Sequence, residues 1–368
     1  MQRYRKINYL DFSKEFSLHR KEYLSAVERV FKSGVYILSN EVTEFEKEFA
    51  NYLGVKCCVG VGNGLEAIQI SLMALGIKKG DEVITTPLSA VATTLAILAV
   101  GATPVFVDID ENGQINADLI ESAITNKTKA VLPVDLYGQP ANLVRIKDIC
   151  RKNKLFLVED ACQAHGSTFK GKRLGTYGDV GCFSFYPTKN LGAIGDGGAI
   201  VTEDPDLAEI FREIRDYGQK SKYVHVRFGL NSRLDELQAA ILREKLKYLD
   251  KYNEKRRDIA KKYVEKLKDI RDLKMVLPRK IDDSNFHLFV VRTKQRDKLQ
   301  SFLKENGVPS LVHYPIAIPD QPMFKGKYKG LEIPVARKFV DEVLSLPCHP
   351  FMDSNDINYI SAKISNFV

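Results

Sequence analysis

Lys189 is the residue whose surroundings first suggest covalent chemistry. It lies in the segment CFSFYPTKNLGAIGDGG (182–198), where an apolar run ends in a turn that also holds Ser184 and Thr188, followed by several glycines. A lysine just past a buried strand can be partly desolvated, which lowers the pKa of its amine and makes it nucleophilic toward an aldehyde. Taken alone, the segment is explained more simply by a surface lysine.

Asp160 ends the apolar run of a second segment, LFLVEDACQAHG (155–166). A buried carboxylate is costly unless a cation accompanies it. Pyridoxal 5'-phosphate (PLP) chemistry needs such a carboxylate to keep the pyridine nitrogen protonated, so that the ring can accept electrons. Gln163, three residues further on, could lie beside the ring hydroxyl. The alternative that stays open for Asp160 is a helix N-cap.

A third segment, GVGNGLEAI (60–68), has the pattern of a strand, a glycine turn and a helix. Backbone N–H groups at a helix N-terminus bind phosphate, and Gly64 and Leu65 stand at that point. The dinucleotide pattern G-x-G-x-x-G fails because Leu65 occupies its last position, and the lysine of a Walker motif is absent. A tight turn without a ligand is the alternative. Together, the three segments supply the lysine, carboxylate and phosphate cradle that PLP requires.

The elements that must position these residues alternate along the chain. The apolar runs between about 55 and 204 are CCVGV, EVITT, TPVFVDI, AVLPVDL, LFLVED, VGCFSF and GGAIVT, and helices are predicted over 65–76, 90–100, 116–125 and 141–153. This alternation indicates an α/β fold with a largely parallel sheet, in which ligands lie at the carboxyl ends of strands. Ser232 and Asp235 are predicted to cap a further long helix.

A change of pattern near residue 250 predicts two domains. Long helices, short strands such as HLFVVRT and proline-rich loops follow that point. We therefore expect a large PLP-binding domain with an N-terminal arm over 1–250 and a small C-terminal domain over 251–368.

Composition narrows the class of protein. The 368 residues carry a formal net charge of +8, and much of the excess lies over 243–280, where acidic and basic residues alternate at helical spacing. That arrangement favours a solvated helix face over a nucleic-acid surface. No apolar run reaches the roughly 18 residues of a membrane helix, the N-terminus lacks a secretion signal, and none of the six cysteines forms a Cys-x-x-Cys pair. The sequence predicts a cytoplasmic protein with buried free thiols, no metal site and no nucleic-acid or membrane partner.

The chain resembles the DegT/DnrJ-type PLP-dependent sugar-nucleotide aminotransferases along nearly its whole length. The segments that carry the resemblance include SGVYILSNEVTEFEKEFA, LYGQPANL, EDACQAHG, SFYPTKNLGAIGDGG, GLNSRLDELQAAIL, VHYP and LSLPCHP. The resemblance implies the aspartate-aminotransferase fold (fold type I), in which a large domain with a mixed, mostly parallel sheet is joined to a smaller C-terminal α+β domain. It also implies a homodimer whose active sites lie at the subunit interface.

The resemblance also assigns roles to individual residues. Lys189 is the lysine that holds PLP as a Schiff base, and Asp160 pairs with the ring nitrogen. The remaining cofactor-binding residues implied are Gly64 and Leu65 (phosphate, through backbone amides), Gln163 (ring hydroxyl), Ser184 (phosphate) and Asn231 (phosphate of the other subunit). Residues expected to line the substrate site are Tyr186, Tyr217, His313, Tyr314 and Asp135.

Within this family, GNGLEAI and SRLDELQAA are most similar to enzymes that aminate dTDP-linked 3-keto-6-deoxyhexoses, with L-glutamate as donor, giving dTDP-3-amino-3,6-dideoxyhexoses for surface glycans. Three positions depart from the pattern. Leu65 stands where many members have threonine, Ala90 lies near the place of an aromatic residue that covers the cofactor ring, and Asp135 replaces a histidine that is usual in the 3-amino subgroup.

The sequence leaves alternative substrates and an alternative class of protein open. The substrate could be a 4-keto nucleotide sugar or a UDP-linked 3-keto sugar. The sugar-dehydrating branch of the family has histidine in place of the lysine, so Lys189 argues against it. A non-enzymatic regulator on the same scaffold would be expected to lose Lys189 or Asp160, and both are present.

Overall fold

A seven-stranded sheet forms the centre of the computed structural model, which describes residues 7–367. The strands lie in the order β1-β9-β8-β5-β4-β2-β3, and β9 runs antiparallel to both of its neighbours, whereas the strands from β8 to β3 are parallel. Their bounds are β1 (Cys57–Val61), β2 (Glu82–Thr85), β3 (Thr103–Phe106), β4 (Thr128–Leu132), β5 (Phe156–Asp160), β8 (Val180–Ser184) and β9 (Gly198–Thr202). This sheet confirms the predicted fold class and every apolar run that was assigned to it.

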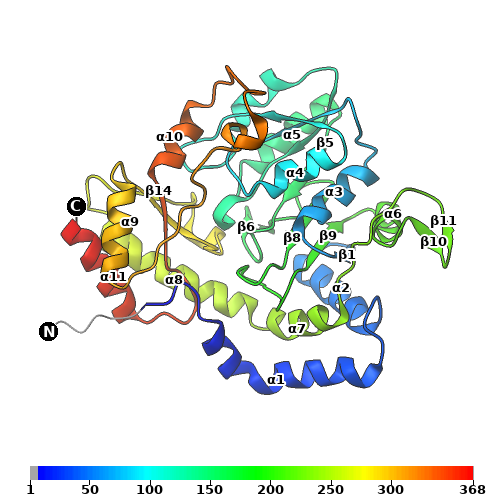
Figure 1. Cartoon of the computed structure of the whole chain (residues 1–368), viewed down its shortest axis with the longest axis horizontal. Helices are drawn as coiled ribbons and strands as arrows, with labels where there is room; N and C mark the ends of the chain where they lie inside the picture. The colour runs from blue at the N-terminus through cyan, green and yellow to red at the C-terminus, as the bar shows by residue number, and fades with distance from the viewer. Residues whose placement is uncertain (1–6, 368) are drawn as a thin grey trace.

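Helices cover both faces of the sheet, because its strands are apolar on both sides. One core packs α2 (Asn40–Leu53), α5 (Leu143–Asn153) and α7 (Glu236–Leu246) against residues such as Val131 of β4. The other packs α3 (Gly64–Ala74), α4 (Ala92–Ala99) and α6 (Pro205–Arg215) against the alternate residues of the same strand, Ala130 and Leu132. The sheet is therefore the middle of three layers (Figure 1).

A second, antiparallel sheet follows later in the chain. It consists of β12 (Lys274–Val276), β13 (Phe289–Arg292) and β14 (Val343–Leu346). The helices α8 (Leu249–Leu267), α9 (Arg296–Glu305) and α11 (Ser354–Phe367) share one core with this sheet, and α10 (Pro334–Glu342) belongs to the core on its other face. The boundary that we predict after residue 250 would fall within the first turn of α8.

Shorter elements complete the described chain: β6 (Thr168–Phe169), β7 (Lys172–Arg173), β10 (Gln219–Ser221), β11 (Val224–His225) and six 3₁₀ turns (Ala117–Leu119, Glu121–Ala123, Leu136–Gly138, Ile281–Asp283, Ile318–Asp320, Pro322–Phe324). The helix predicted over 116–125 is wrong, since two of these 3₁₀ turns stand there. In residues 7–367 no helix is both long and apolar enough to cross a membrane.

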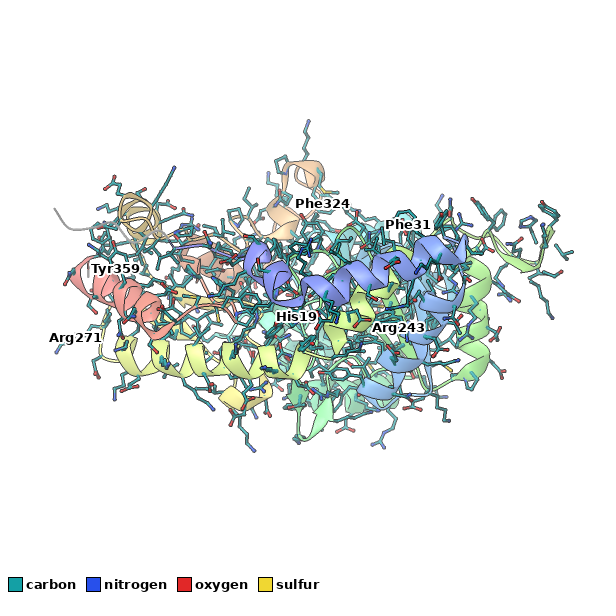
Figure 2. All side chains as sticks on the ribbon, turned by 90° about the horizontal axis from the view of Figure 1, so that it is seen from below. His19, Phe31, Arg243, Arg271, Phe324 and Tyr359 are labelled. Atoms are coloured by element: carbon teal, nitrogen blue, oxygen red, sulfur yellow. The ribbon has the colours of Figure 1, made fainter. Side chains whose placement is uncertain are left out.

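The N-terminal segment forms a long helix, α1 (Phe12–Ser33), that packs on α7. Asp11 caps its start by accepting a hydrogen bond from the Lys14 N–H (3.0 Å), and Gly34 ends it in the left-handed conformation. Figure 2 shows α1, with His19 and Phe31, lying across the lower side of the molecule. The β10–β11 hairpin projects at one end of the molecule in both views (Figures 1 and 2).

The predicted capping pair of α7 is wrong. Asp235 occupies the N-cap position, but its side chain caps nothing. Ser232 instead accepts a hydrogen bond from the Gly62 N–H (3.0 Å), which ties the start of α7 to the glycine turn after β1.

Candidate active site

The N-terminus of α3 forms an anion cradle. Asn63 caps the helix by accepting from the Glu66 N–H (2.9 Å), so the N–H groups of Gly64 and Leu65 remain without an acceptor inside the helix. A Cβ at Gly64 would lie 2.6 Å from the Ser184 Cβ and 2.9 Å from the Cys162 Sγ. Glycine is therefore required here, and its absence of a side chain lets the ends of β5 and β8 meet the helix N-terminus.

Asp160 lies at the end of β5 with 4% of its surface exposed. The Thr93 hydroxyl of α4 donates to Oδ2 (2.7 Å), and the Cys162 N–H donates to Oδ1 (3.2 Å). Ser89 Oγ lies 2.9 Å from Thr93 Oγ1 and completes the chain of hydroxyls. No lysine or arginine of the described chain forms an ion pair with this carboxylate, which therefore suits a cationic ligand.

Lys189 lies in a tight turn after β8. Its N–H donates to the Tyr186 carbonyl (2.8 Å), and a Cβ at Gly192 would lie 2.4 Å from the Pro187 carbonyl oxygen. Burial lowers the pKa of Lys189, while the neighbouring Cys162 and Asp160 act in the opposite direction. A larger neutral fraction makes the amine a better nucleophile and base at neutral pH.

Gln163 is held in one orientation by the backbone. Its Oε1 accepts from the Tyr137 N–H (2.7 Å), which leaves Nε2 to donate to the Tyr314 hydroxyl (3.3 Å). Burial raises the pKa of Tyr314 to about 12, so the phenol stays protonated. Burial, followed by the charge of Lys189, lowers the pKa of the neighbouring His313 to about 4. The structure thus brings Gln163, His313 and Tyr314 to the vicinity of Lys189.

Three of the predicted site residues are exposed at the surface of the single chain. Asn231 is exposed and pairs with Asp216 in an isolated bridge. Tyr186 and Tyr217 are about half exposed, at 52% and 47%. None of the three makes a hydrogen bond through its side chain to Lys189, Asp160 or Gln163 among the interactions of residues 7–367.

Asp135 requires a correction, because it does not line the substrate site. Its side chain is fully buried and lies beside Glu159, whose Oε2 accepts from the Tyr177 N–H (2.9 Å). Burial and the charge of Glu159 raise the pKa of Asp135, so this pair retains a proton. Glu159 and Asp160 are successive residues of a strand and point to opposite faces of the sheet, which places Asp135 on the face away from Asp160.

Sequence reasoning missed Thr93, His165 and His287. Thr93 orients Asp160, as described above. His165 is fully buried against Phe183 and Phe185, and burial and the charge of Lys189 lower its pKa to about 3. The sequence pattern around Thr93 gives no sign of its role, whereas the buried histidine of DACQAHG could have been marked for its nearness to Asp160 and Gln163.

This arrangement fits PLP. The free N–H groups of Gly64 and Leu65 can hold a phosphate, the uncompensated Asp160 can face a protonated ring nitrogen, and Lys189 can bond to an aldehyde carbon. All six cysteines are free, and the described residues contain no group of three His, Cys, Asp or Glu side chains that could hold a metal ion.

Comparisons with known proteins identify the family of the chain. Residues 18–365 match the model of the DegT/DnrJ/EryC1/StrS aminotransferase family. A solved structure described as Streptomyces venezuelae DesV in complex with a ketimine intermediate superposes with a TM-score of 0.96 at 41% identity, with 98% of each chain covered.

Three curated relatives of similar sequence identity to this chain have names that describe different functions. The chain is 44% identical to a dTDP-3-amino-3,6-dideoxy-alpha-D-galactopyranose transaminase of Aneurinibacillus thermoaerophilus (98% of this chain, 99% of the relative). It is 40% identical to a UDP-2-acetamido-2-deoxy-3-oxo-D-glucuronate aminotransferase of Pseudomonas aeruginosa (98% and 100%). It is 42% identical to a protein of Geobacillus stearothermophilus named a pleiotropic regulatory protein (97% of each).

Proposed function

The chain belongs to the DegT/DnrJ/EryC1/StrS aminotransferase family and is a PLP-dependent sugar-nucleotide aminotransferase, and we propose that it transfers the amino group of L-glutamate to a dTDP-linked 3-keto-6-deoxyhexose. The product is then a dTDP-3-amino-3,6-dideoxyhexose. The observation that carries the chemistry is the meeting of Lys189, the carboxylate of Asp160, which forms no ion pair within the described residues, and the α3 N-terminus at three strand ends. The choice of sugar rests on GNGLEAI, GLNSRLDELQAA and the relative from A. thermoaerophilus.

Bound PLP supplies a protonated pyridine ring that withdraws electrons from the α carbon of the amino donor. Asp160 keeps that ring nitrogen protonated, and Thr93 holds the carboxylate in place. Lys189 would anchor the cofactor, and its free Nζ would carry the α proton of the donor to the cofactor and, in the second half of the reaction, a proton from the cofactor to the sugar carbon. Because burial lowers the pKa of Lys189, its amine is neutral more often than a surface lysine would be.

We propose a homodimer with shared active sites. Large apolar side chains are exposed on the β10–β11 hairpin, where Tyr223 is 80% exposed, just after it, where Phe228 is 93% exposed, and on α1 and the segment after it. Exposed apolar surface of this extent marks an interaction site. Asn231 lies a few residues after this hairpin. If a second copy packs against the hairpin, Asn231 can approach the cofactor phosphate of that copy, as the family resemblance implies.

The substrate proposal is tested by running the reaction in reverse. Enzyme, PLP and 2-oxoglutarate are incubated side by side with dTDP-3-amino, dTDP-4-amino and UDP-linked 3-amino sugars, and glutamate is measured. The dTDP-3-amino-6-deoxyhexose should react fastest. Faster turnover of the 4-amino or UDP-linked sugar would overturn the 3-position or the dTDP assignment and leave the PLP mechanism in place.

A regulator is the second candidate, favoured by the name of the G. stearothermophilus relative. The retention of Lys189 and Asp160 supports an enzyme instead, because a protein that only binds its partners has no need of a nucleophilic lysine beside this carboxylate. Absence of glutamate formation with every amino sugar nucleotide, in a protein loaded with PLP, would favour the regulator.

A further inference from the structure

Three asparagines, two of them fully buried, hold the turn that carries Lys189. Asn190, the next residue, donates from Nδ2 to the Asn253 Oδ1 of α8 (2.8 Å) and to the Asn285 carbonyl (3.0 Å). Asn253 in turn donates to the His165 carbonyl (2.8 Å), and Asn285 donates to the carbonyl of Gln163 (3.0 Å). Asn253 and Asn285 are both fully buried. The network therefore joins the lysine turn, the Asp160–Ser167 loop and the segment that precedes β13.

This hydrogen-bond network determines which ring nitrogen of His287 carries the proton. The Asn285 carbonyl oxygen can only accept, so the Asn190 atom facing it must be the Nδ2 donor, and the Oδ1 of Asn190 must face His287 Nδ1 (3.2 Å). Because Oδ1 only accepts, Nδ1 must carry the proton. A neutral ring then has an unprotonated Nε2, and no partner for that nitrogen exists among the hydrogen bonds of the described chain.

Neutrality of the ring follows from its surroundings. Burial lowers the pKa of His287 well below its ordinary value, and the positive charges of Lys189 and Arg256 lower it further, with His313 and His165 adding to the effect. His287 also lines a cavity of about 100 Å³ together with Thr188 and His313; the other lining residues are Tyr9, Leu10, Leu288, Leu311, Leu346 and Cys348.

The lining of this cavity selects the kind of group that it can hold. It contains no carboxylate to balance an ammonium and no lysine or arginine to balance a carboxylate or phosphate. Apolar leucines and neutral acceptor or donor groups remain, which suit an uncharged group with both apolar and hydroxyl surface. A hexose ring presents such a surface.

We propose that this cavity, defined by His287, His313 and Thr188, is a sugar subsite in which His287 Nε2 accepts a hydrogen bond from a sugar hydroxyl. The proposal rests on the proposed function, because it takes the substrate to be a nucleotide sugar. Asn190 sets the tautomer and is thus a positioning residue, whereas His287 contacts the substrate.

The tautomer can be measured without turnover. The chain has six histidines, so ¹H–¹⁵N spectra of ¹⁵N-histidine-labelled holoenzyme can be assigned by comparison with His287→Asn. The ring of His287 should show a protonated Nδ1 and an unprotonated Nε2, unchanged from about pH 6 to about pH 9. An Nε2–H tautomer, or an imidazolium in this range, would overturn the proposal.

Binding measurements test whether His287 Nε2 accepts a hydrogen bond from a sugar hydroxyl. Asn at position 287 can still donate to Asn190 but removes the acceptor at the Nε2 position, whereas Gln can place its amide oxygen near that position. His287→Asn should weaken binding of the dTDP-3-amino sugar about tenfold, as expected for one lost hydrogen bond, and leave binding of sugar-free dTDP unchanged. His287→Gln should recover part of the loss, and His19→Asn, a buried histidine on α1, controls for general effects.

Each outcome has a separate meaning. Equal weakening of dTDP and of the dTDP-sugar, or no weakening of either, would refute the sugar subsite while the proposed function stands. A wild-type enzyme that turns over no amino sugar nucleotide would refute the proposed function, and with it the sugar as occupant of the cavity.

Discussion

Asp160→Asn separates the electrostatic role of this side chain from its structural role. In the structure, Asp160 Oδ1 accepts from the Cys162 N–H, an interaction that an asparagine oxygen can keep. The Nδ2 of asparagine would replace Oδ2 and face Thr93, whose hydroxyl can turn its proton toward Ser89 Oγ, 2.9 Å away, and accept instead. Each hydrogen-bonding group keeps a partner, so we expect the free energy of unfolding to fall by less than about 2 kcal/mol.

The effect on catalysis should be much larger. An uncharged amide cannot hold the cofactor ring nitrogen as a pyridinium, and a deprotonated ring is a poor acceptor of electrons. We expect removal of the α proton of L-glutamate to slow at least about a hundredfold, which is comparable to the loss of a positioned acid or base. Stopped-flow absorbance of the PLP form mixed with L-glutamate measures this step without any sugar substrate.

Thr93→Val is the matched control, because it removes the hydrogen bond to Asp160 and leaves the charge. Its loss of rate should be roughly tenfold or less. PLP content and thermal stability are measured for both variants, so that loss of cofactor or of fold is not mistaken for loss of electron withdrawal. Wild-type rates in a folded, PLP-loaded Asp160→Asn protein would contradict the role assigned to this carboxylate.

Three further predictions concern the anchor, the interface and the buried acid pair. Lys189→Ala should abolish turnover and the borohydride-fixed attachment of PLP, and peptide mapping that finds the label on another lysine would refute the assignment. Mixing inactive Lys189→Ala and inactive Asn231→Asp subunits should restore some activity, since one site of each heterodimer holds both intact residues; no recovery after proven subunit exchange would argue against shared sites. The raised pKa of Asp135 means that the folded chain keeps a proton that the unfolded chain releases above about pH 4. The free energy of unfolding should therefore decrease as pH rises above that value, and urea titrations of Asp135→Asn should show a flatter pH dependence.

The sheet and the strand-end residues could be predicted because both follow from local patterns. Each strand of the sheet is a largely apolar run, which is the pattern of a strand buried on both faces. Gly64, Asp160 and Lys189 lie at or soon after the ends of such runs. The segment 116–125 misled the prediction because Ala117 and Ile120 are buried at a helical spacing, although the chain there makes only two 3₁₀ turns.

Contacts between side chains far apart in the sequence could not be predicted from the sequence alone. Thr93 and Thr94 are neighbours of the same type, and only the packing of α4 decides that Thr93 meets Asp160. His287 obtains its proton position from Asn190, 97 residues earlier in the chain. Such pairs depend on tertiary structure, and no periodicity or spacing in a single sequence encodes them.

Asp135 shows how a family comparison and a structure can carry different information about one position. A histidine is usual at this place in the 3-amino subgroup, so Asp135 departs from the subgroup pattern. In the structure, however, the carboxyl of Asp135 pairs with Glu159 on the face of the sheet opposite Asp160, and both are buried. Asp135 contacts Glu159, and its backbone N–H donates to the Asp160 carbonyl (3.0 Å), so it adjoins the strand that carries Asp160 without facing the substrate side. The replacement is therefore no argument against a 3-keto sugar, and we expect the residues that select the sugar to include His287 and His313, which line the same cavity as Thr188.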